Sequence, residues 1–317
     1  MRSASVVVPS HGGGERLGRL LDSLAVQTAD HEAIVVDNGS GGAVSRACES
    51  HSGVEVIGLE RNAGFSRAVN IAAERAGGDA LVLLNDDCVC EPGFVEAIAG
   101  TLDPARGVVM AAGVLRDGSD RSLIDSAGME LDRTLLVFDY LNGEPTSRLE
   151  AGVPAPVGPS GAAAAFDRSA FLDAGGFDER LFAYWEDVDL VLRLLREGAR
   201  CALAREALGT HEHSATLGSG SARKNYLMGF GRGYVLRKWR VLRSPSRAAG
   251  VLARDGALCA GQAVIDRNLA GLRGRVHGYR AAQPTESFPD GALTARPPGP
   301  LATLRRRAAR RARLRRR

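Results

Sequence analysis

Residues 80–90 read Ala-Leu-Val-Leu-Leu-Asn-Asp-Asp-Cys-Val-Cys, so an unbroken apolar run ends at two adjacent carboxylates, Asp86 and Asp87. An apolar run of this length without alternation is typical of a strand buried on both faces of a parallel sheet. Ligands of open α/β sheets bind just beyond the carboxyl ends of such strands. The two acids, with Asn85 beside them, therefore predict a seat for a divalent cation that holds a phosphate. The alternative is a helix cap, since Asp is favoured ahead of the helix predicted over residues 94–101.

Upstream of this strand, short apolar strands alternate with helical periodicity. Leu17, Leu20, Leu21 and Leu24 recur at i, i+3, i+4 and i+7, which predicts a helix over residues 17–27. Strands are predicted over residues 3–8, 33–36 and 54–59, and a second helix over residues 66–76. The alternation predicts βαβ units, and hence an α/β fold on a mostly parallel, Rossmann-like sheet flanked by helices.

Every strand of this half ends in a polar loop. The loops are Ser10-His11, Asp37-Asn38, Asn62 and Asp86-Asp87. In a parallel sheet they lie along one edge and can line a single crevice. The alternative is that every strand must end in something polar.

A second acidic cluster, Trp185-Glu186-Asp187, opens the helix predicted from Val188 to Gly198. Acids in a first helical turn commonly compensate the helix dipole, which is the simpler interpretation. It accounts less well for several acids behind the aromatic side chains of Phe182 and Tyr184. Aromatic rings beside carboxylates suit a sugar ring whose hydroxyl is deprotonated by a base.

The remaining predicted elements lie between and after these clusters. A hairpin is expected around residues 129–137, within a segment, 117–150, that either covers the crevice or is a surface excursion. Two short strands are expected over residues 201–204 and 207–209, followed by His211, which is a further ligand if Asp87 holds a cation. A structural histidine is the alternative.

Composition bounds the class of protein. The formal net charge of +4 depends on residues 305–317, which hold nine arginines and no acid, so the body is not a nucleic-acid-binding surface. The five cysteines are odd in number and form no Cys-x-x-Cys pair, which indicates a reduced cytoplasmic protein without a zinc site. The start of the chain leaves no room for a signal peptide, and no apolar run reaches the ~18 residues of a transmembrane helix.

Helices are predicted over residues 224–243 and 247–280, and the prolines after Gln283 predict a disordered linker. The expected organisation is a domain over residues 1–215, a helical extension over 222–282, and a linker with an arginine-rich tail over 283–317. The first domain divides into a nucleotide-sugar half, 1–115, and an acceptor half, 116–215.

Six motifs in order resemble those of the family-2 inverting glycosyltransferases with a GT-A fold, closest to the bacterial rhamnosyltransferase-like branch. They are Val-Val-Val-Pro-Ser (6–10), Val-Val-Asp-Asn-Gly-Ser (35–40), Asn-Ala-Gly-Phe (62–65), Leu-Leu-Asn-Asp-Asp (83–87), Gly-Gly-Phe-Asp-Glu (175–179) and Trp-Glu-Asp-Val-Asp-Leu (185–190). The resemblance covers roughly residues 4–215. Any one motif is weakly specific, whereas six in this order and spacing are highly specific.

The resemblance implies a role for each matched position. Asp187 is similar to the family's catalytic base and Glu186 to its acidic neighbour. Asp86 and Asp87 resemble the Asp-x-Asp site that holds Mg²⁺ or Mn²⁺ on the donor diphosphate, and His211 stands where the family often has a further metal ligand. The nucleotide-sugar contacts implied are Pro9, His11, Asp37, Asn62, Gly64 and Asp86.

Three departures from the family pattern matter. Asn85 replaces the first carboxylate, which implies weaker or water-mediated coordination. Ser10-His11-Gly12 replaces the frequent Thr-Tyr-Asn, which leaves the base preference open. The Gln-x-x-Arg-Trp signature of processive polysaccharide synthases is missing, so a processive synthase is not expected.

The expected function is a metal-dependent inverting glycosyltransferase of cell-envelope polysaccharide synthesis. It would move one sugar from a nucleotide-sugar donor, with dTDP-rhamnose as the candidate, to a glycan or lipid-linked acceptor. Its expected location is cytoplasmic, with peripheral contact to the anionic inner face of the membrane and no specific nucleic acid. One alternative is a sugar-phosphate nucleotidyltransferase, for which Gly12-Gly13-Gly14-Glu15-Arg16 is a partial match. The other is a non-enzymatic binder of anionic membrane or nucleic acid through the arginine tail.

Overall fold

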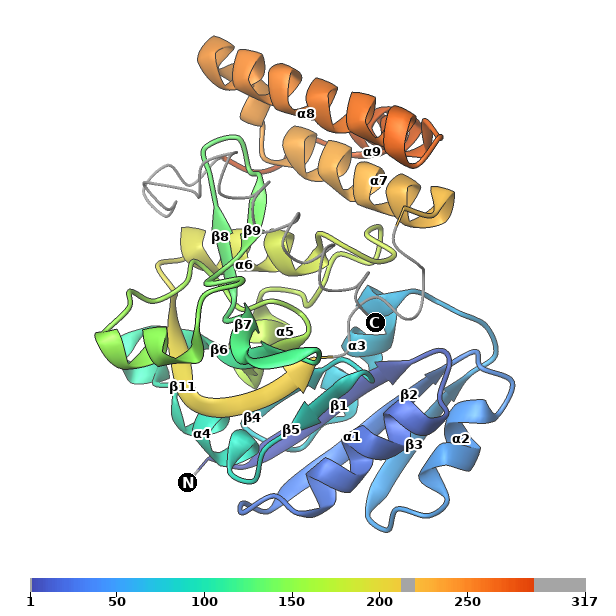
Figure 1. Ribbon diagram of the computed structural model, residues 1–317, viewed down its shortest axis with the longest axis vertical. Coiled ribbons are helices and arrows are strands. Elements are labelled where there is room, and N and C mark those ends of the chain that lie inside the picture. Colours follow the sequence, from blue (N-terminus) through green and yellow to red (C-terminus); the bar gives the residue numbers. More distant parts are fainter. Residues whose placement is uncertain (1, 212–219, 288–317) are drawn as a thin grey trace.

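The computed structural model describes residues 2–211 and 220–287, and within these ranges one sheet holds nine strands (Figure 1). Its first half is parallel and confirms the α/β prediction. The strand order there is β3 (Val54–Leu59), β2 (His31–Asn38), β1 (Ala4–Ser10) and β4 (Ala80–Leu84). Every residue of β1 and β4 is buried, as the unbroken apolar runs predict.

Helices cover both faces of this half. The leucines of α1 (Glu15–Ala25) and the apolar side of α4 (Phe94–Gly100) share one core cluster with the side chains of one sheet face. The opposite face packs against α3 (Phe65–Arg75), α5 (Arg168–Asp173) and α6 (Glu186–Arg196). The short α2 (Ala43–Cys48) was not predicted, because six residues after a Gly-rich turn carry too little periodicity.

The second half of the sheet is mixed. β10 (Ala163–Asp167) pairs antiparallel with both β4 and β6 (Val108–Asp117), and its register sets Ala163 opposite Leu84. β11 (Arg200–His211) runs parallel to β6 and antiparallel to β5 (Cys88–Cys90). The unpredicted β7 (Asp120–Ser126) pairs with β6, and β8 (Met129–Leu131) and β9 (Val137–Asp139) form the expected hairpin.

The prediction of two short strands over residues 201–209 was wrong. β11 is one continuous strand, with a register shift between Leu203 and Leu208. The charged pair Arg205-Glu206 between the two predicted strands is exposed at this irregularity, and pairing with β6 resumes at Leu208. The resulting bent strand sets His211 opposite Cys88, at the start of β5 (Figure 1).

Three helices form a layer at the top of the molecule in Figure 1, which we call the C-terminal layer. They are α7 (Ala222–Lys238), α8 (Pro245–Ile265) and α9 (Ala270–Ala281). The prediction of a single helix over residues 247–280 was wrong, because Arg267 has a φ of 52° and the Asn268 side chain accepts from Ala270 N, which starts a new helix. Tyr234 and Trp239 join the core cluster of α6 and so tie the layer to the sheet.

Three short 3₁₀ segments complete the secondary structure of the described chain, at Pro104–Arg106, Thr146–Ala151 and Val241–Arg243. None of the helices in residues 2–211 and 220–287 has the length and apolar character that a membrane span requires. The predicted arginine tail, and most of the predicted linker, fall outside the described residues.

Candidate functional site

The acids of the turn after β4 bond to groups outside α4 and do not cap that helix. α4 begins after the left-handed Gly93, and the side chain that bonds to its first turn is that of Gln27, whose Oε1 accepts from Val95 N at 3.0 Å. Asp86 instead accepts a 2.5 Å hydrogen bond from the Ser10 hydroxyl, at the end of β1. Burial raises the pKa of Asp86, although the bond from Ser10 opposes that rise. The ends of two parallel strands therefore meet at one carboxylate.

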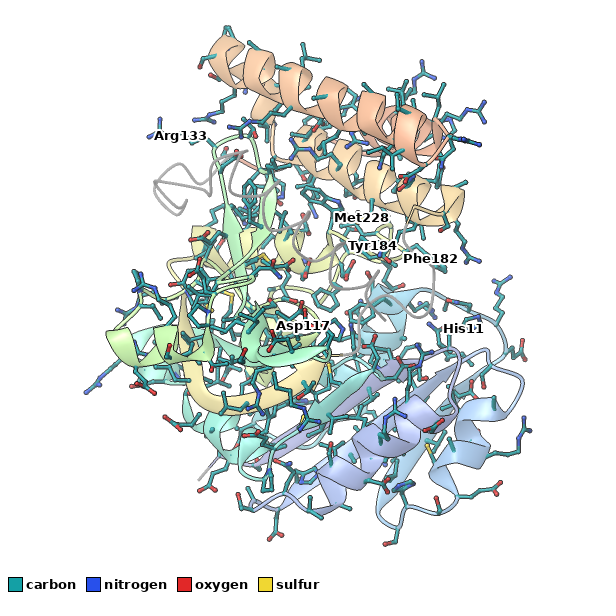
Figure 2. The ribbon with its side chains drawn as sticks, viewed as in Figure 1. His11, Asp117, Arg133, Phe182, Tyr184 and Met228 are labelled. Atoms are coloured by element: carbon teal, nitrogen blue, oxygen red, sulfur yellow. The ribbon has the colours of Figure 1, made fainter. Side chains whose placement is uncertain are left out.

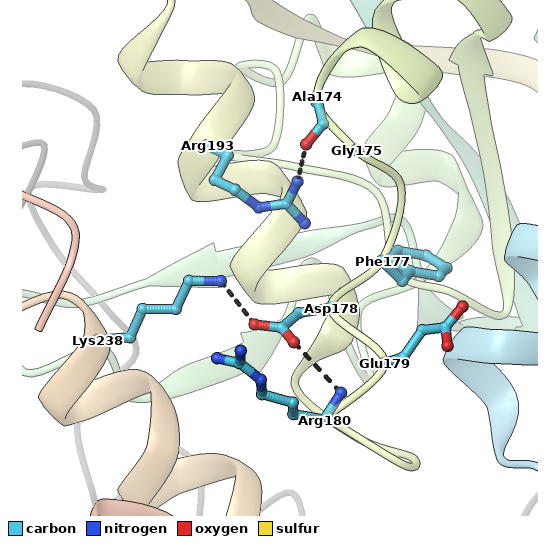
Figure 3. Close-up of a pocket in the computed structure, with 8 residues that line it drawn as sticks. All are labelled: Ala174, Gly175, Phe177, Asp178, Glu179, Arg180, Arg193 and Lys238. Atoms are coloured by element: carbon cyan, nitrogen blue, oxygen red, sulfur yellow. Dashed lines mark hydrogen bonds and ion pairs between the residues drawn. The ribbon is translucent and has the colours of Figure 1, made fainter. Parts of the chain in front are cut away.

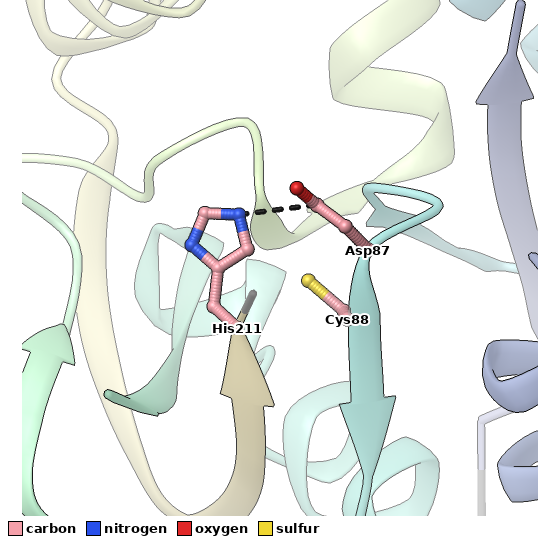
Figure 4. Close-up of side chains that lie close together, drawn as sticks. All are labelled: Asp87, Cys88 and His211. Atoms are coloured by element: carbon pink, nitrogen blue, oxygen red, sulfur yellow. Dashed lines mark ion pairs between the residues drawn. The ribbon is translucent and has the colours of Figure 1, made fainter. Parts of the chain in front are cut away.

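Asp87 faces His211 (Figure 4), and a second carboxylate lies behind that histidine. Its Oδ1 lies 3.1 Å from His211 Nε2, and His211 Nδ1 donates to Asp125 Oδ2 at 3.0 Å. Burial lowers the pKa of His211, but the two carboxylates outweigh it and raise the pKa to about 9. The ligand atoms of Asp87, Cys88 and His211 lie within 4.8 Å of one another.

This group fits a divalent cation. Asp87 Oδ1 is buried, and no hydrogen bond of good geometry reaches it from the residues described. A carboxylate oxygen and an imidazole nitrogen that face each other are suitable ligands for Mn²⁺, and Asp125 fixes which nitrogen of His211 is presented. The sequence offered no direct signal for Asp125, which lies 86 residues before His211.

The second cluster is held at the start of α6. Asp187 Oδ2 accepts from Gly161 N at 3.1 Å and Oδ1 accepts from Val188 N at 2.8 Å. Burial raises the pKa of Asp187, and these backbone donors limit the rise. Burial also raises the pKa of Glu186 well above its usual range, the charge of Asp187 adds to it, and Glu186 Oε2 is buried without a hydrogen-bond partner among the described residues.

Asp189, the third acid of this helix, is structural. It is fully buried and accepts from Lys238 Nζ at 2.8 Å and Trp239 Nε1 at 3.0 Å. Lys238 also reaches Asp178 at 2.9 Å, in the cavity of about 440 Å³ shown in Figure 3. The charged groups that line this cavity mostly bond to one another or to the backbone, as Arg193 does with the Ala174 carbonyl. The bonds among these charged groups therefore anchor α6 to α7.

The two acidic clusters, about a hundred residues apart in sequence, are joined at Gly161–Ala162. Gly161 N donates to Asp187, whereas the Ala162 carbonyl accepts from Asn85 N at 3.2 Å and from Cys88 Sγ at 3.4 Å. This dipeptide precedes β10, whose antiparallel pairing sets it beside the end of β4. No local pattern in the sequence predicted this link between the clusters.

The predicted nucleotide-contacting residues lie at the same edge of the sheet. His11 Nδ1 donates to the Asn38 carbonyl at 2.8 Å, and Asp37 Oδ1 accepts from Ser40 N at 2.8 Å. Asn62 Oδ1 accepts from Gly64 N at 3.0 Å. Pro9 is buried on β1 opposite Val36. His11 is exposed.

Gly64 lies where the loop after β3 contacts Phe182, the first residue of the aromatic run. Its φ is 94°, and a Cβ there would lie 2.5 Å from the Phe182 carbonyl oxygen, so only glycine fits. Phe65 N donates to that same carbonyl at 2.7 Å. Figure 2 shows Phe182 and Tyr184 between α7, marked by Met228, and the strand ends, marked by His11. Tyr184 and Trp185 both have positive φ, of 71° and 78°, a strained pair next to Glu186.

Solved structures share this fold. The chain superposes on GalNAc-T7 with UDP, GalNAc and Mn²⁺ with a TM-score of 0.61 at 16% identity, covering 90% of this chain and 55% of the other. It also matches the mannosyltransferase PcManGT of Pyrobaculum calidifontis, in complex with GDP-Man and Mn²⁺, with a TM-score of 0.53 at 18% identity, covering 91% and 77%. The fold is that of the GT-A glycosyltransferases.

The family model for glycosyl transferase family 2 matches residues 5–171, just over half of the chain, so the protein belongs to that family. It is 29% identical over 270 residues to the pre-mycofactocin glycosyltransferase of Mycobacterium tuberculosis, with 82% of this chain and 52% of the relative aligned. It is 33% identical over 219 residues to the N-acetylglucosaminyl-diphospho-decaprenol L-rhamnosyltransferase of the same organism, covering 61% and 70%. The chain thus spans about half the length of the first relative.

Family membership confirms the resemblance that the six ordered motifs indicated.

Proposed function

We propose that this enzyme is a metal-dependent, inverting glycosyltransferase that transfers one sugar from a nucleotide-sugar donor to a lipid-linked or other glycan acceptor. The observation that carries the proposal is the junction at Gly161–Ala162, which sets Asp187 beside the turn of Asp86 and Asp87. Inverting transfer needs a base on the acceptor hydroxyl and charge stabilisation of the leaving diphosphate on the opposite side. The two clusters supply one group for each task.

Asp187 is the proposed base. Its raised pKa gives it more proton affinity than an ordinary aspartate, and the Gly161 N–H fixes the direction of Oδ2. Burial and the charge of Asp187 raise the pKa of Glu186 further than that of Asp187, so Glu186 is the first of the two to take up a proton. This difference favours the charged form of Asp187, which a base requires.

Asp87 and His211 would hold the divalent cation, Mg²⁺ or Mn²⁺, with Asp86 next to them. When bound, the cation offsets the charge that develops on the departing diphosphate. Pro9, His11, Asp37, Asn62 and Gly64 would border the nucleotide. The donor would occupy residues 1–115 and the acceptor residues 116–215, with residues 222–282 as an appended helical extension.

Two relatives suggest acceptors. The rhamnosyltransferase named for N-acetylglucosaminyl-diphospho-decaprenol has the higher identity, which favours dTDP-rhamnose and a lipid diphosphate acceptor in cell-envelope synthesis. The pre-mycofactocin glycosyltransferase aligns over more of this chain, which makes pre-mycofactocin the second candidate acceptor. A lipid acceptor would bring the enzyme to the inner face of the cytoplasmic membrane, with the arginine tail as one contact.

The test is transfer of labelled sugar from dTDP-rhamnose to both acceptors, with Mn²⁺, for the native enzyme and Asp187→Asn. We expect Asp187→Asn to lose about a thousandfold in rate, as for loss of a general base, while donor affinity stays within about twofold. Asp173→Asn, an exposed acid at the end of α5, is the matched control and should retain full activity. Full activity of Asp187→Asn would overturn the proposal.

A further inference from the structure

Exposed apolar side chains are concentrated in one part of the molecule. Of the nine large apolar side chains that are exposed among the described residues, eight belong to the C-terminal layer, and the ninth is Val26 at the end of α1. The eight are Met228, Leu252, Val264, Ile265, Leu269, Leu272, Val276 and Tyr279. Single exposed apolar residues are ordinary, whereas a cluster of this size marks a contact surface.

The outward face of α8 carries no charge. The exposed uncharged residues between positions 249 and 264 recur at helical spacing and form one stripe along the helix. Arg254 is also exposed, but it lies beside this stripe and pairs with Asp132. Asp255 points inward to Arg232 at 3.2 Å. The stripe consists of Ala249, Leu252, Ala253, Gly256, Ala257, Ala260 and Val264. A helix that faces water normally carries charged side chains there, so this face is suited to an apolar surrounding.

The outer side of α9 is apolar and basic. Its inner side, Gly271, Gly274 and Gly278, is buried against α7. Leu272 and Val276 therefore project from the opposite side, and the exposed Arg273 and Arg280 alternate with them. Apolar and cationic side chains on one helix face are typical of helices that lie in a membrane interface.

The charge of the C-terminal layer indicates which kind of partner its exposed surface binds. Residues 222–287 hold thirteen Lys and Arg but three acids, and each acid is already engaged: Asp255 with Arg232, Asp266 with Asn225, and Glu286 with Arg196. A second copy of this surface would be repelled by its like charge. A nucleic acid would leave the apolar stripe in water, whereas an anionic bilayer satisfies both the charge and the apolar stripe.

We propose that the outward faces of α8 and α9 form a docking surface for an anionic lipid bilayer. α8 lies in the interface plane with its uncharged stripe among the acyl chains, and the exposed arginines contact the lipid phosphates. The surface is independent of the donor site, so it stands or falls separately from the proposed function. It would hold the enzyme against the leaflet that contains a lipid-linked acceptor.

The first test reads the position of α8 itself in the full chain. An environment-sensitive fluorophore is attached at Ala257→Cys in a Cys259→Ser background, because the other four cysteines are buried. With vesicles rich in phosphatidylglycerol, we expect the emission to shift to shorter wavelength, and with pure phosphatidylcholine vesicles we expect no shift. The same fluorophore at Val26→Cys, on the remote exposed apolar residue, should not respond to either.

The second test measures affinity by vesicle sedimentation. Leu252→Glu with Val264→Glu should weaken binding to phosphatidylglycerol vesicles at least tenfold, and Val26→Glu should change it less than twofold. Both altered positions on α8 are exposed, at 69% and 78%, so the thermal midpoint and the donor-induced stabilisation should match those of the native enzyme. Arg273→Glu with Arg280→Glu should remove the preference for anionic over neutral vesicles.

Three outcomes would overturn the docking surface. Vesicle binding with an unshifted probe on α8 would show that another segment makes the contact. A dimer that dissociates in Leu252→Glu would assign the stripe to a second copy. A probe shift of equal size with duplex DNA would assign it to nucleic acid. Loss of transfer activity with vesicle binding intact would count against the proposed function alone.

Discussion

His211 lies between two carboxylates that have different tasks. Asp125 is almost fully buried and receives the Nδ1 proton at 3.0 Å, so Nε2 is the nitrogen left to face Asp87. A carboxylate behind a histidine fixes its orientation and increases its basicity as a ligand. Asp125 is thus a positioning residue for the proposed cation site, which it does not need to touch.

Asp125→Asn should weaken Mn²⁺ affinity by about 10- to 100-fold, because the neutral amide holds the ring less firmly and withdraws its support for ligation. The change is measured by calorimetric titration of Mn²⁺ with a donor analogue present. Asp120→Asn, an acid of the same strand that is more exposed, serves as the control. Unchanged Mn²⁺ affinity in Asp125→Asn would remove Asp125 from this role.

The protonation of His211 should appear in the pH dependence of metal binding. Because its folded-state pKa is about 9 and the usual value for histidine is near 6.5, the ring is charged at neutral pH without metal. The stability that this charge contributes is fully present below pH ~6.5 and is lost as the pH rises through ~9. A metal must displace the proton, so Mn²⁺ affinity should rise about tenfold per pH unit from pH 7 to 9 and then level off.

The measurement is the same titration at pH 7, 8 and 9.5. His211→Asn should bind more weakly and lose the slope. A slope that persists in His211→Asn would assign the proton to another group.

At the scale of elements, the contact between α7 and α9 depends on glycines from both helices. Gly229 and Gly233 of α7 meet the α9 backbone, and Gly274 and Gly278 meet the α7 backbone, so the two helix axes approach more closely than side chains would allow. This pairing explains why the segment after α8 folds back. Local periodicity alone predicted one long helix there.

Gly278→Ala should destabilise the protein by about 2 kcal/mol, because its methyl group would overlap the Phe230 carbonyl and force the helices apart. Gly256→Ala is the matched control: it lies on the open face of α8 with no atom near its Cβ, and should gain up to about 1 kcal/mol from helix propensity. Urea unfolding monitored by circular dichroism separates the two. Equal effects of both substitutions would contradict the close-packed contact.

At the scale of the whole molecule, two contacts near the site join the proposed donor half to the proposed acceptor half. One is the Gly161–Ala162 junction between the acidic clusters, and the other is the contact of Gly64 and Phe65 with the Phe182 carbonyl. A donor that bridges these parts binds the folded chain only. Donor binding should therefore stabilise the molecule as a whole.

A preferred nucleotide sugar at about 100 times its Kd should add about 2.7 kcal/mol, which corresponds to roughly 4 °C in Tm for a protein of this size. A thermal-shift series compares dTDP-, UDP- and GDP-sugars with and without Mn²⁺. Asp187→Asn should keep the full shift, whereas Asp87→Asn should lose its Mn²⁺ dependence. Equal shifts with and without Mn²⁺ in the native enzyme would contradict the metal-dependent donor site.

The sequence by itself determined the elements whose pattern is local. The apolar runs of β1 and β4, the leucine spacing of α1 and the polar strand ends that hold His11, Asp37 and Asp86 all depend on neighbouring residues. The ordered motifs also identified the family, because six matches in sequence need no knowledge of contacts.

Only the tertiary structure decided which distant segments meet. The insertion of β10 between β4 and β6, the pairing of His211 with Asp125, and the return of α9 onto α7 each join residues far apart in the chain. Such contacts are set by packing and hydrogen bonding between elements, which no periodicity within one element encodes. For that reason both acidic clusters were visible in the sequence, but the Gly161–Ala162 dipeptide that joins them was not.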